Sequence, residues 1–210
     1  GARPGMGKTS LALNFARNVA LQSKKCVAVF SLEMTREQLA ERLIASEAAI
    51  PSTKFRTGDF DANEWSRIAQ ASGILTECNM FLDETPGMTV AEIKAKLRRL
   101  NPKPDLVIID YFECLLPEKT QYSTDSEWSR EAVTMRKLEN MAKDLNIAIW
   151  IPTQGNKGSI TSPDVVTMDQ AGGSIRKVQI CQVVISIARS LDDVDKNKAT
   201  LAILKNTTLL

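Results

Sequence analysis

The first ten residues constrain this chain more than any other stretch. They read Gly1-Ala2-Arg3-Pro4-Gly5-Met6-Gly7-Lys8-Thr9-Ser10, which fits the pattern small-x-x-x-x-Gly-Lys-Thr of a phosphate-binding loop. Gly5 and Gly7 allow the backbone to turn its N–H groups toward phosphate oxygens. A helical pattern from Lys8 to Gln22 follows at once, and the N-terminus of a helix attracts anions. The stretch predicts a nucleoside triphosphate site rather than a chance glycine-rich turn.

All nine residues from Ala2 to Ser10 are therefore predicted to bind nucleotide. Within them, Lys8 brings a positive charge to the β- and γ-phosphates, and the Thr9 hydroxyl is suited to bind Mg²⁺. We expect ATP or another nucleoside triphosphate, together with Mg²⁺, as the cofactors.

Composition limits the other classes of site. The 210 residues are enough for one α/β domain with a full core, and a formal net charge of +2 is too balanced to bind nucleic acid through bulk charge. A nucleic-acid site must then be a local patch or a surface built from several subunits. The four cysteines are far apart and the chain has no histidine, which argues against a classical zinc site. No long apolar run appears, so we expect a cytoplasmic protein without a membrane segment.

Apolar runs alternate with amphipathic stretches along the chain. This order predicts an α/β fold with a mostly parallel sheet, flanked by helices and carrying antiparallel edge strands. The expected strands lie at 26–31, 80–82, 106–110, 147–151, 183–187 and 201–204. Helices are expected at 8–22 and 125–145. Three further helices are expected between them: one that buries Leu39 and Leu43, one that buries Trp65 and Ile68, and one that begins at the capping pair Thr89 and Glu92. Residues 1–210 are predicted to form a single domain. A buried strand is expected before the phosphate-binding loop and is missing here, so we expect a truncated piece of a longer chain.

Three polar side chains follow predicted strands, where ligands of open α/β sheets bind. Asp110 follows four apolar residues and is predicted to hold Mg²⁺ opposite Thr9, although an aspartate can also cap a turn. Glu33 is placed to act as the base that deprotonates the water attacking the γ-phosphate. The alternative is that it is an ordinary surface glutamate before a helix. Gln154 fits a sensor of the γ-phosphate, and its position by itself leaves that role open.

These segments resemble the ATPase domain of DnaB-type replicative DNA helicases. The resemblance rests on residues 1–9, 29–34, 37–43, 83–93 and 108–111 and on the strand end at Gln154. It implies a RecA-like fold, a homohexameric ring around single-stranded DNA, and nucleotide hydrolysis at subunit interfaces. By the same resemblance Glu33 is the base, Asp110 the metal ligand and Gln154 the phosphate sensor. A primase and a helicase loader are further partners that the family suggests.

The resemblance also indicates a DNA-binding loop near residues 169–177. Its predicted contacts are Gln170, Gly172, Gly173, Ser174, Arg176 and Lys177. Glycines let backbone N–H groups approach a phosphate, and the two basic side chains add charge. An ordinary glycine turn before a strand is the alternative. The family usually has an Arg-Glu pair where this chain has Gln170 and Ala171.

A second departure lies near the end of the chain. The family's last strand ends in Lys-x-Arg, which reaches the γ-phosphate of the neighbouring subunit, whereas this chain has Lys205-Asn206-Thr207. Lys205 is therefore a predicted catalytic residue, but the arginine finger is absent, with Arg189 as one candidate replacement. These departures suggest a diverged, phage-borne member.

The predicted function is an ATP-driven helicase motor at the replication fork. The alternative is another RecA-like, DNA-dependent ATPase, in recombination or regulation, that does not unwind processively. A third reading, an assembly subunit that binds ATP without hydrolysing it, is disfavoured by the presence of both Glu33 and Asp110.

Overall fold

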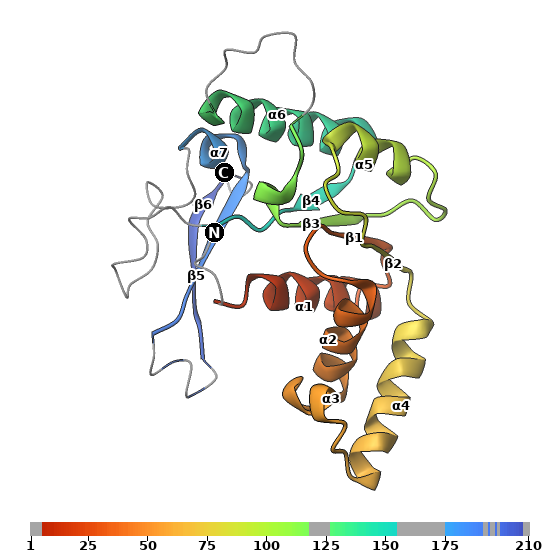
Figure 1. Ribbon diagram of the computed structural model, residues 1–210. Coiled ribbons are helices and arrows are strands. Elements are labelled where there is room, and N and C mark those ends of the chain that lie inside the picture. The colour runs from red at the N-terminus through yellow and green to blue at the C-terminus, as the bar shows by residue number, and fades with distance from the viewer. Residues whose placement is uncertain are drawn as a thin grey trace.

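Figure 1 shows the chain as a computed structural model. The structure describes residues 6–117, 127–154, 175–190, 193, 196 and 198–207, without the side chains of 127–129 and 175–176. All structural statements below concern these residues.

A four-stranded parallel sheet forms the centre of the molecule. Its order is β2-β1-β3-β4, and the strands are β1 (Val27–Ser31), β2 (Met80–Asp83), β3 (Leu106–Asp110) and β4 (Ala148–Trp150). All three pairs are parallel, as the sequence predicts. Because Ser31 pairs with Asp110 in the register of β1 and β3, the ends of these two strands lie side by side.

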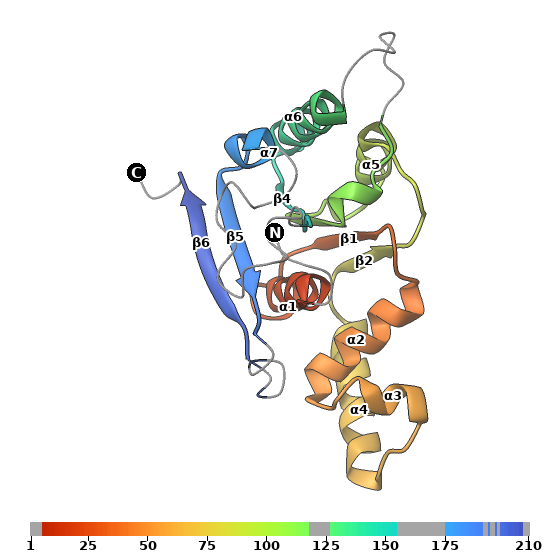
Figure 2. The ribbon, with the colours of Figure 1, turned by 60° about the vertical axis from the view of Figure 1, so that its left-hand side comes forward.

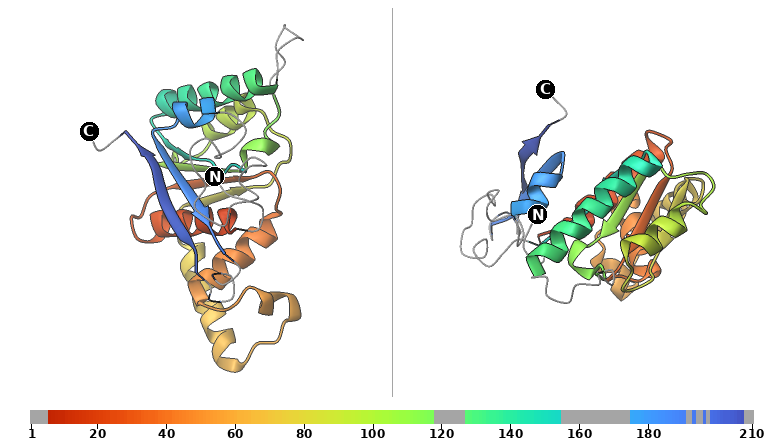
Figure 3. Two further views of the ribbon diagram at one scale, coloured as in Figure 1. Left: turned by 90° about the vertical axis from the view of Figure 1, so that its left-hand side faces the viewer. Right: turned by 90° about the horizontal axis from the view of Figure 1, so that it is seen from above.

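Helices cover both faces of this sheet (Figures 1 and 3). The helices are α1 (Lys8–Leu21), α2 (Arg36–Ala48), α3 (Thr53–Thr57), α4 (Ala62–Thr76), α5 (Val90–Leu97), α6 (Glu127–Leu145) and α7 (Ile175–Ile180), with one 3-10 turn, η1 (Phe112–Cys114). α1 and α2 lie on one face, and α5 and α6 lie on the other. α3 and the far end of α4 extend away from the sheet.

The two faces of the sheet bury separate halves of the core, because successive side chains of a strand point to opposite sides. Ala28 and Phe30 of β1 pack with residues of α5 and α6, such as Ile93. Val27 and Val29 of the same strand pack with α1 and α2. Both sets are almost fully buried. This two-sided burial explains why the strands read as continuous apolar runs rather than as alternating ones.

Local capping signals set where the helices begin. Thr35 accepts a hydrogen bond from the backbone N–H of Gln38 at the start of α2, and Thr89 does the same for Glu92 at the start of α5. In both cases the third helical residue bonds back to the cap, which completes a capping box. The two capping boxes predicted from the sequence are confirmed.

The last two strands form a separate antiparallel sheet. β5 (Val183–Ala188) pairs with β6 (Thr200–Asn206), and within the described part of the chain they pair only with each other. Figure 2 shows the pair beside α1 and α7. The predicted antiparallel strands are therefore present, at the side where β4 ends the main sheet.

Two local predictions were wrong. Proline and glycine at the ends of residues 51–58 predict a loop, but this stretch contains the short helix α3. Trp65, expected on the buried face of α4, is 55% exposed. It lies in the first turn of α4, where Phe60 packs edge-on against it but does not cover it. Residues 175–180, to which the sequence analysis assigns neither a helix nor a strand, form α7.

No helix in the described ranges combines the length and apolar character needed to cross a membrane.

Candidate nucleotide site

The described part of the phosphate-binding loop leads directly into α1. Gly7 stands before the helix with φ of 92°, a left-handed conformation that favours glycine. No side chain caps the first turn of α1 and no acidic residue lies in it. The N–H groups at the start of α1 and the positive end of the helix dipole therefore point at an anion site in front of Lys8 and Thr9.

Asp110 ends β3 beside this helix and is 3% exposed. Burial raises the pKa of its carboxyl group, and a hydrogen bond from the Thr9 side chain opposes that shift. The second carboxylate oxygen, Oδ2, is buried and has no hydrogen-bond partner among the described residues. A buried anionic oxygen without a partner is costly, so this atom is suited to a ligand that brings positive charge.

These groups fit the magnesium ion that the sequence predicts. Mg²⁺ is bound in nucleotide sites through one or two protein oxygens, water and substrate phosphates, rather than by a full protein cage. Thr9 and Asp110 supply two such oxygens on one side. Consistent with this partial set, the described residues contain no cluster of three or more carboxylate, cysteine or histidine side chains that could hold a metal alone.

Lys8 lies among acidic side chains. Burial lowers its pKa below that of a free lysine, and three carboxylates oppose the shift. They belong, in decreasing order of influence, to Glu113, Asp110 and Glu33. The Lys8 Nζ also lies 5.5 Å from the centre of the Tyr111 ring. The ammonium group is thus held at the strand ends, where a phosphate would meet it.

Glu33 follows β1 on a short turn. The Ser31 hydroxyl donates to the carbonyl of Met34 at 2.8 Å and accepts from its N–H at 3.0 Å, which fixes the turn that presents Glu33. The side chain is exposed, yet its charge raises the pKa of Asp110 and that of Lys8. The structure therefore brings Glu33 close to the phosphate site while leaving it open to water.

Gln154 lies just beyond β4, and its backbone is held by a residue that the sequence reasoning missed. Glu113, in η1, accepts hydrogen bonds from the Thr153 hydroxyl at 2.5 Å and from the Gln154 N–H at 3.3 Å. The Phe112 N–H also donates to the carbonyl of Pro152 at 3.0 Å. The segment after Asp110 therefore fixes the end of β4.

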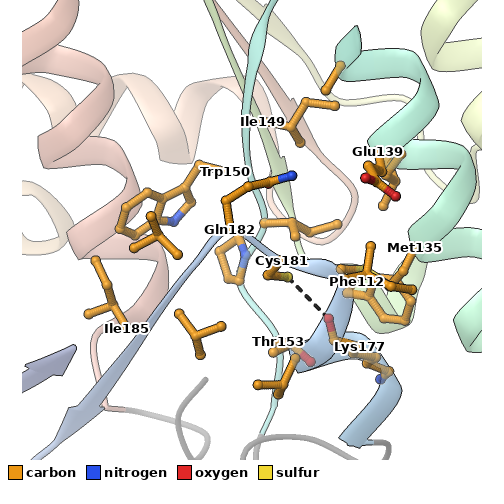
Figure 4. A pocket seen from close by; sticks show the side chains of 18 of the residues that line it. Phe112, Met135, Glu139, Ile149, Trp150, Thr153, Lys177, Cys181, Gln182 and Ile185 are labelled. Atoms are coloured by element: carbon orange, nitrogen blue, oxygen red, sulfur yellow. Dashed lines mark hydrogen bonds between the residues drawn. The ribbon is translucent and has the colours of Figure 1, made fainter. Parts of the chain in front are cut away.

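Lys177, predicted to contact DNA, lies in a buried ion-pair cluster. Its side chain is 5% exposed, and its Nζ lies 2.7 Å from Glu131 Oε1 and 3.4 Å from Glu113 Oε1. The same Nζ lies 4.3 Å from the centre of the Phe112 ring, and Figure 4 shows the two side chains together with Thr153. In this arrangement the ammonium faces carboxylates of its own chain.

The end of β6 contacts the neighbouring part of the same chain. The Lys205 ammonium donates to the carbonyls of Val178 at 3.2 Å and Gln179 at 2.7 Å, at the C-terminal part of α7. Thr207 is bonded to the carbonyl of Gln182 through its N–H. Arg189 donates to the carbonyl of Lys198 at 2.8 Å and so holds the turn between β5 and β6.

An apolar cavity of about 360 Å³ lies beside the site, between β4 and β5 (Figure 4). α6 and α7 contribute to its wall, and Lys8 reaches it from the loop. Its lining is mostly aliphatic and aromatic, as at Ile149, Trp150 and Ile185, so it does not fit a triphosphate.

Some predicted site residues lie outside the described residues. They are Ala2, Arg3, Pro4 and Gly5 of the loop and Gln170, Gly172, Gly173 and Ser174 of the predicted DNA-binding loop. The backbone of Arg176 belongs to α7, and its side chain is not described. Met6 and Ser10 flank the Gly-Lys-Thr element, Met6 before it and Ser10 in the first turn of α1.

Comparison with known proteins gives consistent matches. The family model described as DnaB-like helicase C terminal domain matches residues 1–206. The replicative DNA helicase DnaC of Bacillus subtilis is 36% identical over 159 residues, which are 75% of this chain and 35% of that protein. The replicative DNA helicase DnaB of Leifsonia xyli subsp. xyli is 38% identical over 159 residues, 75% of this chain and 34% of that protein.

Two solved structures superpose on almost the whole chain. One is a DnaB-like replicative helicase, solved in a study of its interactions with primase, with a TM-score of 0.87 and 26% identity, covering 99% of this chain and 51% of that one. The other is an ATPase domain, with a TM-score of 0.87 and 27% identity, covering 99% of this chain and 75% of that one. The chain spans about a third of the length of the curated relatives given above.

Proposed function

Because this chain belongs to the DnaB-like helicase C-terminal domain family, we propose that it is the motor domain of a replicative DNA helicase. In this role it hydrolyses ATP to move along single-stranded DNA and to unwind the duplex at the fork. The observation that carries the proposal is the meeting of the α1 N-terminus with Asp110 and Glu33 at one edge of the parallel sheet. These are the groups that phosphoryl transfer to water needs.

Each group has a separate task in this proposal. Lys8 and the N–H groups at the start of α1 bind the phosphates, and Thr9 and Asp110 would hold Mg²⁺. The ion neutralises charge on the transferred phosphate when bound. Glu33 is exposed enough to contact water and accepts its proton as the water attacks the γ-phosphate. Gln154, with its backbone held by Glu113, reports whether that phosphate is present.

The remaining parts of the motor come from a second subunit and from DNA. We propose a homohexamer in which Lys205 of one subunit serves the nucleotide of the next. Single-stranded DNA is the proposed ligand of the loop around residues 169–177, with the contacts named in the sequence analysis except Lys177, whose ammonium is buried against Glu113 and Glu131. The similarity to a helicase solved in a study of its interactions with primase supports primase as a further partner. The proposed location of the protein is the cytoplasm of a bacterium or of a phage-infected host.

A second candidate is a RecA-like, DNA-dependent ATPase without processive unwinding. Thr207, which stands where the family usually has an arginine, favours it. An arginine finger supplies roughly 10³–10⁵ in turnover in related phosphoryl transfer, so its absence slows hydrolysis unless another cation replaces it.

The deciding experiment uses the full-length protein with ATP and Mg²⁺. We expect single-stranded DNA to stimulate ATP hydrolysis and the protein to unwind a forked duplex. Stimulation without unwinding would select the second candidate. Hydrolysis that single-stranded DNA does not change would contradict both.

A further inference from the structure

A single carboxylate, that of Glu113, connects segments that are far apart in the sequence. It lies in η1, three residues after the predicted metal ligand Asp110. It accepts hydrogen bonds from Thr153 and Gln154 at the end of β4. It also receives the ammonium of Lys177 from α7 at 3.4 Å. One side chain thus joins the strand that carries the predicted phosphate sensor to a helix outside the sheet.

On the α7 side, this connection consists of the ion pairs of a buried lysine, Lys177. Lys177 is nearly fully buried, and its two carboxylate partners, Glu113 and Glu131, have side chains 30% and 22% exposed. A buried ammonium is stable only with such partners, and removing one of them is costly. The position of α7 therefore depends on where the Glu113 carboxylate lies.

The other end of the connection faces the nucleotide site. Among the nearby carboxylates, Glu113 has the largest effect in opposing the lowered pKa of Lys8. Lys8 also lines the same cavity as Phe112, Thr153 and Lys177, which adjoin or contact Glu113. The Glu113 charge therefore lies near both Lys8 at the nucleotide site and Lys177 in α7. A triphosphate bound at the loop would bring several negative charges to Lys8 and repel the Glu113 carboxylate.

We propose that Glu113 is a positioning residue that couples occupancy of the nucleotide site to the placement of α7. The proposal rests on the proposed function only in taking a nucleoside triphosphate as the ligand of the loop. When the phosphates engage Lys8, Glu113 loses that partner and is held by Lys177 and the end of β4 alone. The binding state is thereby passed to α7, whose first residues belong to the predicted DNA-binding loop and whose carbonyls also bind Lys205.

Hydrogen exchange of the full-length protein tests this coupling without requiring DNA or hydrolysis. Exchange of the backbone amides of residues 175–183 is measured with Mg²⁺, with and without a non-hydrolysable ATP analogue. In the unmodified protein we expect the analogue to change the exchange rate of α7 by about fivefold or more, the size of a typical coupling between sites. In Glu113→Gln, which keeps the shape and removes the charge, we expect that change to disappear while the analogue still binds.

Two further variants separate coupling from a general loss of structure. Lys177→Gln should remove the same response, and the double variant should behave like either single one, because both act through one ion pair. Glu47→Gln is the matched control: its side chain is 24% exposed and pairs with Arg17 at 3.6 Å, away from the site. We expect it to retain the response, and we expect all variants to keep the far-ultraviolet circular dichroism of the parent.

The proposal is overturned if the analogue leaves α7 exchange unchanged in the unmodified protein, or if Glu113→Gln keeps the full response. It is also overturned if Glu113→Gln no longer binds the analogue, because Glu113 would then act in binding itself. Failure of the helicase proposal appears separately, as an ATPase that single-stranded DNA does not stimulate. A protein can show that failure and still show the α7 response.

Discussion

The hydroxyl of Thr9 is hydrogen-bonded to the carboxylate of Asp110, across the gap between the first turn of α1 and the end of β3. The other oxygen of that carboxylate is buried without a hydrogen-bond partner in the structure. Two residues 101 positions apart in the chain are thus arranged as the proposed magnesium site requires. A buried carboxylate oxygen without a partner among the described residues is costly.

Asp110→Asn should therefore have opposite effects on activity and stability. Because the ion contributes several kcal/mol to phosphoryl transfer, we expect Mg²⁺-dependent hydrolysis to fall by about a hundredfold or more. Burial raises the pKa of Asp110, so the folded state disfavours its ionised form. At neutral pH without ligand, the variant should melt at a higher temperature than the parent, by an amount that shrinks as the pH falls toward the raised pKa. Melting curves at several pH values and a Mg²⁺ titration of hydrolysis measure both effects.

Asp144→Asn is the control for that prediction. Asp144 pairs with Lys94 on the surface, with a side chain 54% exposed, so its replacement should leave the Mg²⁺ requirement unchanged. A lower melting temperature for Asp110→Asn than for the parent would contradict the assignment of the unpartnered oxygen.

Glu33→Gln should separate binding from hydrolysis. The amide keeps the shape of the side chain but cannot accept the proton of the attacking water, and a general base contributes roughly 10²–10⁴ in rate. We expect hydrolysis to fall by that amount while the dissociation constant of a fluorescent ATP analogue stays within about threefold, since Glu33 lies beside the phosphates and does not hold them. Glu77→Gln, an exposed glutamate at the end of α4, should leave both quantities unchanged. Equal losses of binding and hydrolysis in Glu33→Gln would speak against its role as the base.

Gly7→Ala should weaken nucleotide binding beyond its cost in stability. Gly7 has φ of 92°, and an alanine in the left-handed region costs about 1–2 kcal/mol. Gly58→Ala provides the matched control, because Gly58 has φ of 69° at the end of α3 with open space around its Cα. Urea unfolding should give similar losses of stability for both variants, and a nucleotide titration should show weaker binding for Gly7→Ala alone. Equal affinities would mean that the loop does not need this backbone conformation.

Mixing two inactive variants should locate the action of Lys205. Within one chain, Lys205 binds the carbonyls at the end of α7, whereas the proposed function has it serve a neighbouring subunit. Lys8→Ala removes the lysine proposed to bind phosphate, and Lys205→Ala removes the lysine proposed to reach the neighbouring subunit. If Lys205 acts on the neighbour, mixed rings contain interfaces with both lysines intact, and hydrolysis should exceed that of either variant alone. If the mixture is no more active than its components, Lys205 acts only through α7 of its own chain.

The cavity between β4 and β5 leads to a prediction about chain length. β4 has no strand on its far side within the described residues, and the cavity of about 360 Å³ beside it is lined mainly by apolar side chains. In a chain extended before Gly1, we expect a strand leading into the loop to fill this space. We propose that residues 1–210 form one domain that this strand completes. The extended chain should melt several degrees higher, since about 1 kcal/mol shifts the midpoint by roughly 2–4 °C at this size. Equal melting temperatures for the two chains would contradict the proposal.

Much of the fold and half of the site follow from local sequence pattern. The Gly-Lys-Thr element, the capping boxes at Thr35 and Thr89, and the apolar runs that end at Ser31 and Asp110 act over a few neighbouring residues, so their spacing is visible without the structure. Parallel strands place their carboxyl ends at one edge. That rule predicts that Asp110 and Glu33 lie close together.

The sequence by itself thus determined a nucleotide site on a parallel sheet, and the tertiary structure decided what surrounds it. From the sequence, Lys177 is predicted to be a surface charge near a glycine-rich loop. In the structure it is buried against Glu113, a residue 64 positions away. The segment Ile175–Ile180 has three β-branched residues, which lower helix propensity, but it forms a helix whose final carbonyls are held by Lys205 of β6. Such contacts join distant parts of the chain, and their energy depends on burial and on exact pairing in space. No local pattern records them, which is why the coupling between the site and α7 becomes visible only in the folded molecule.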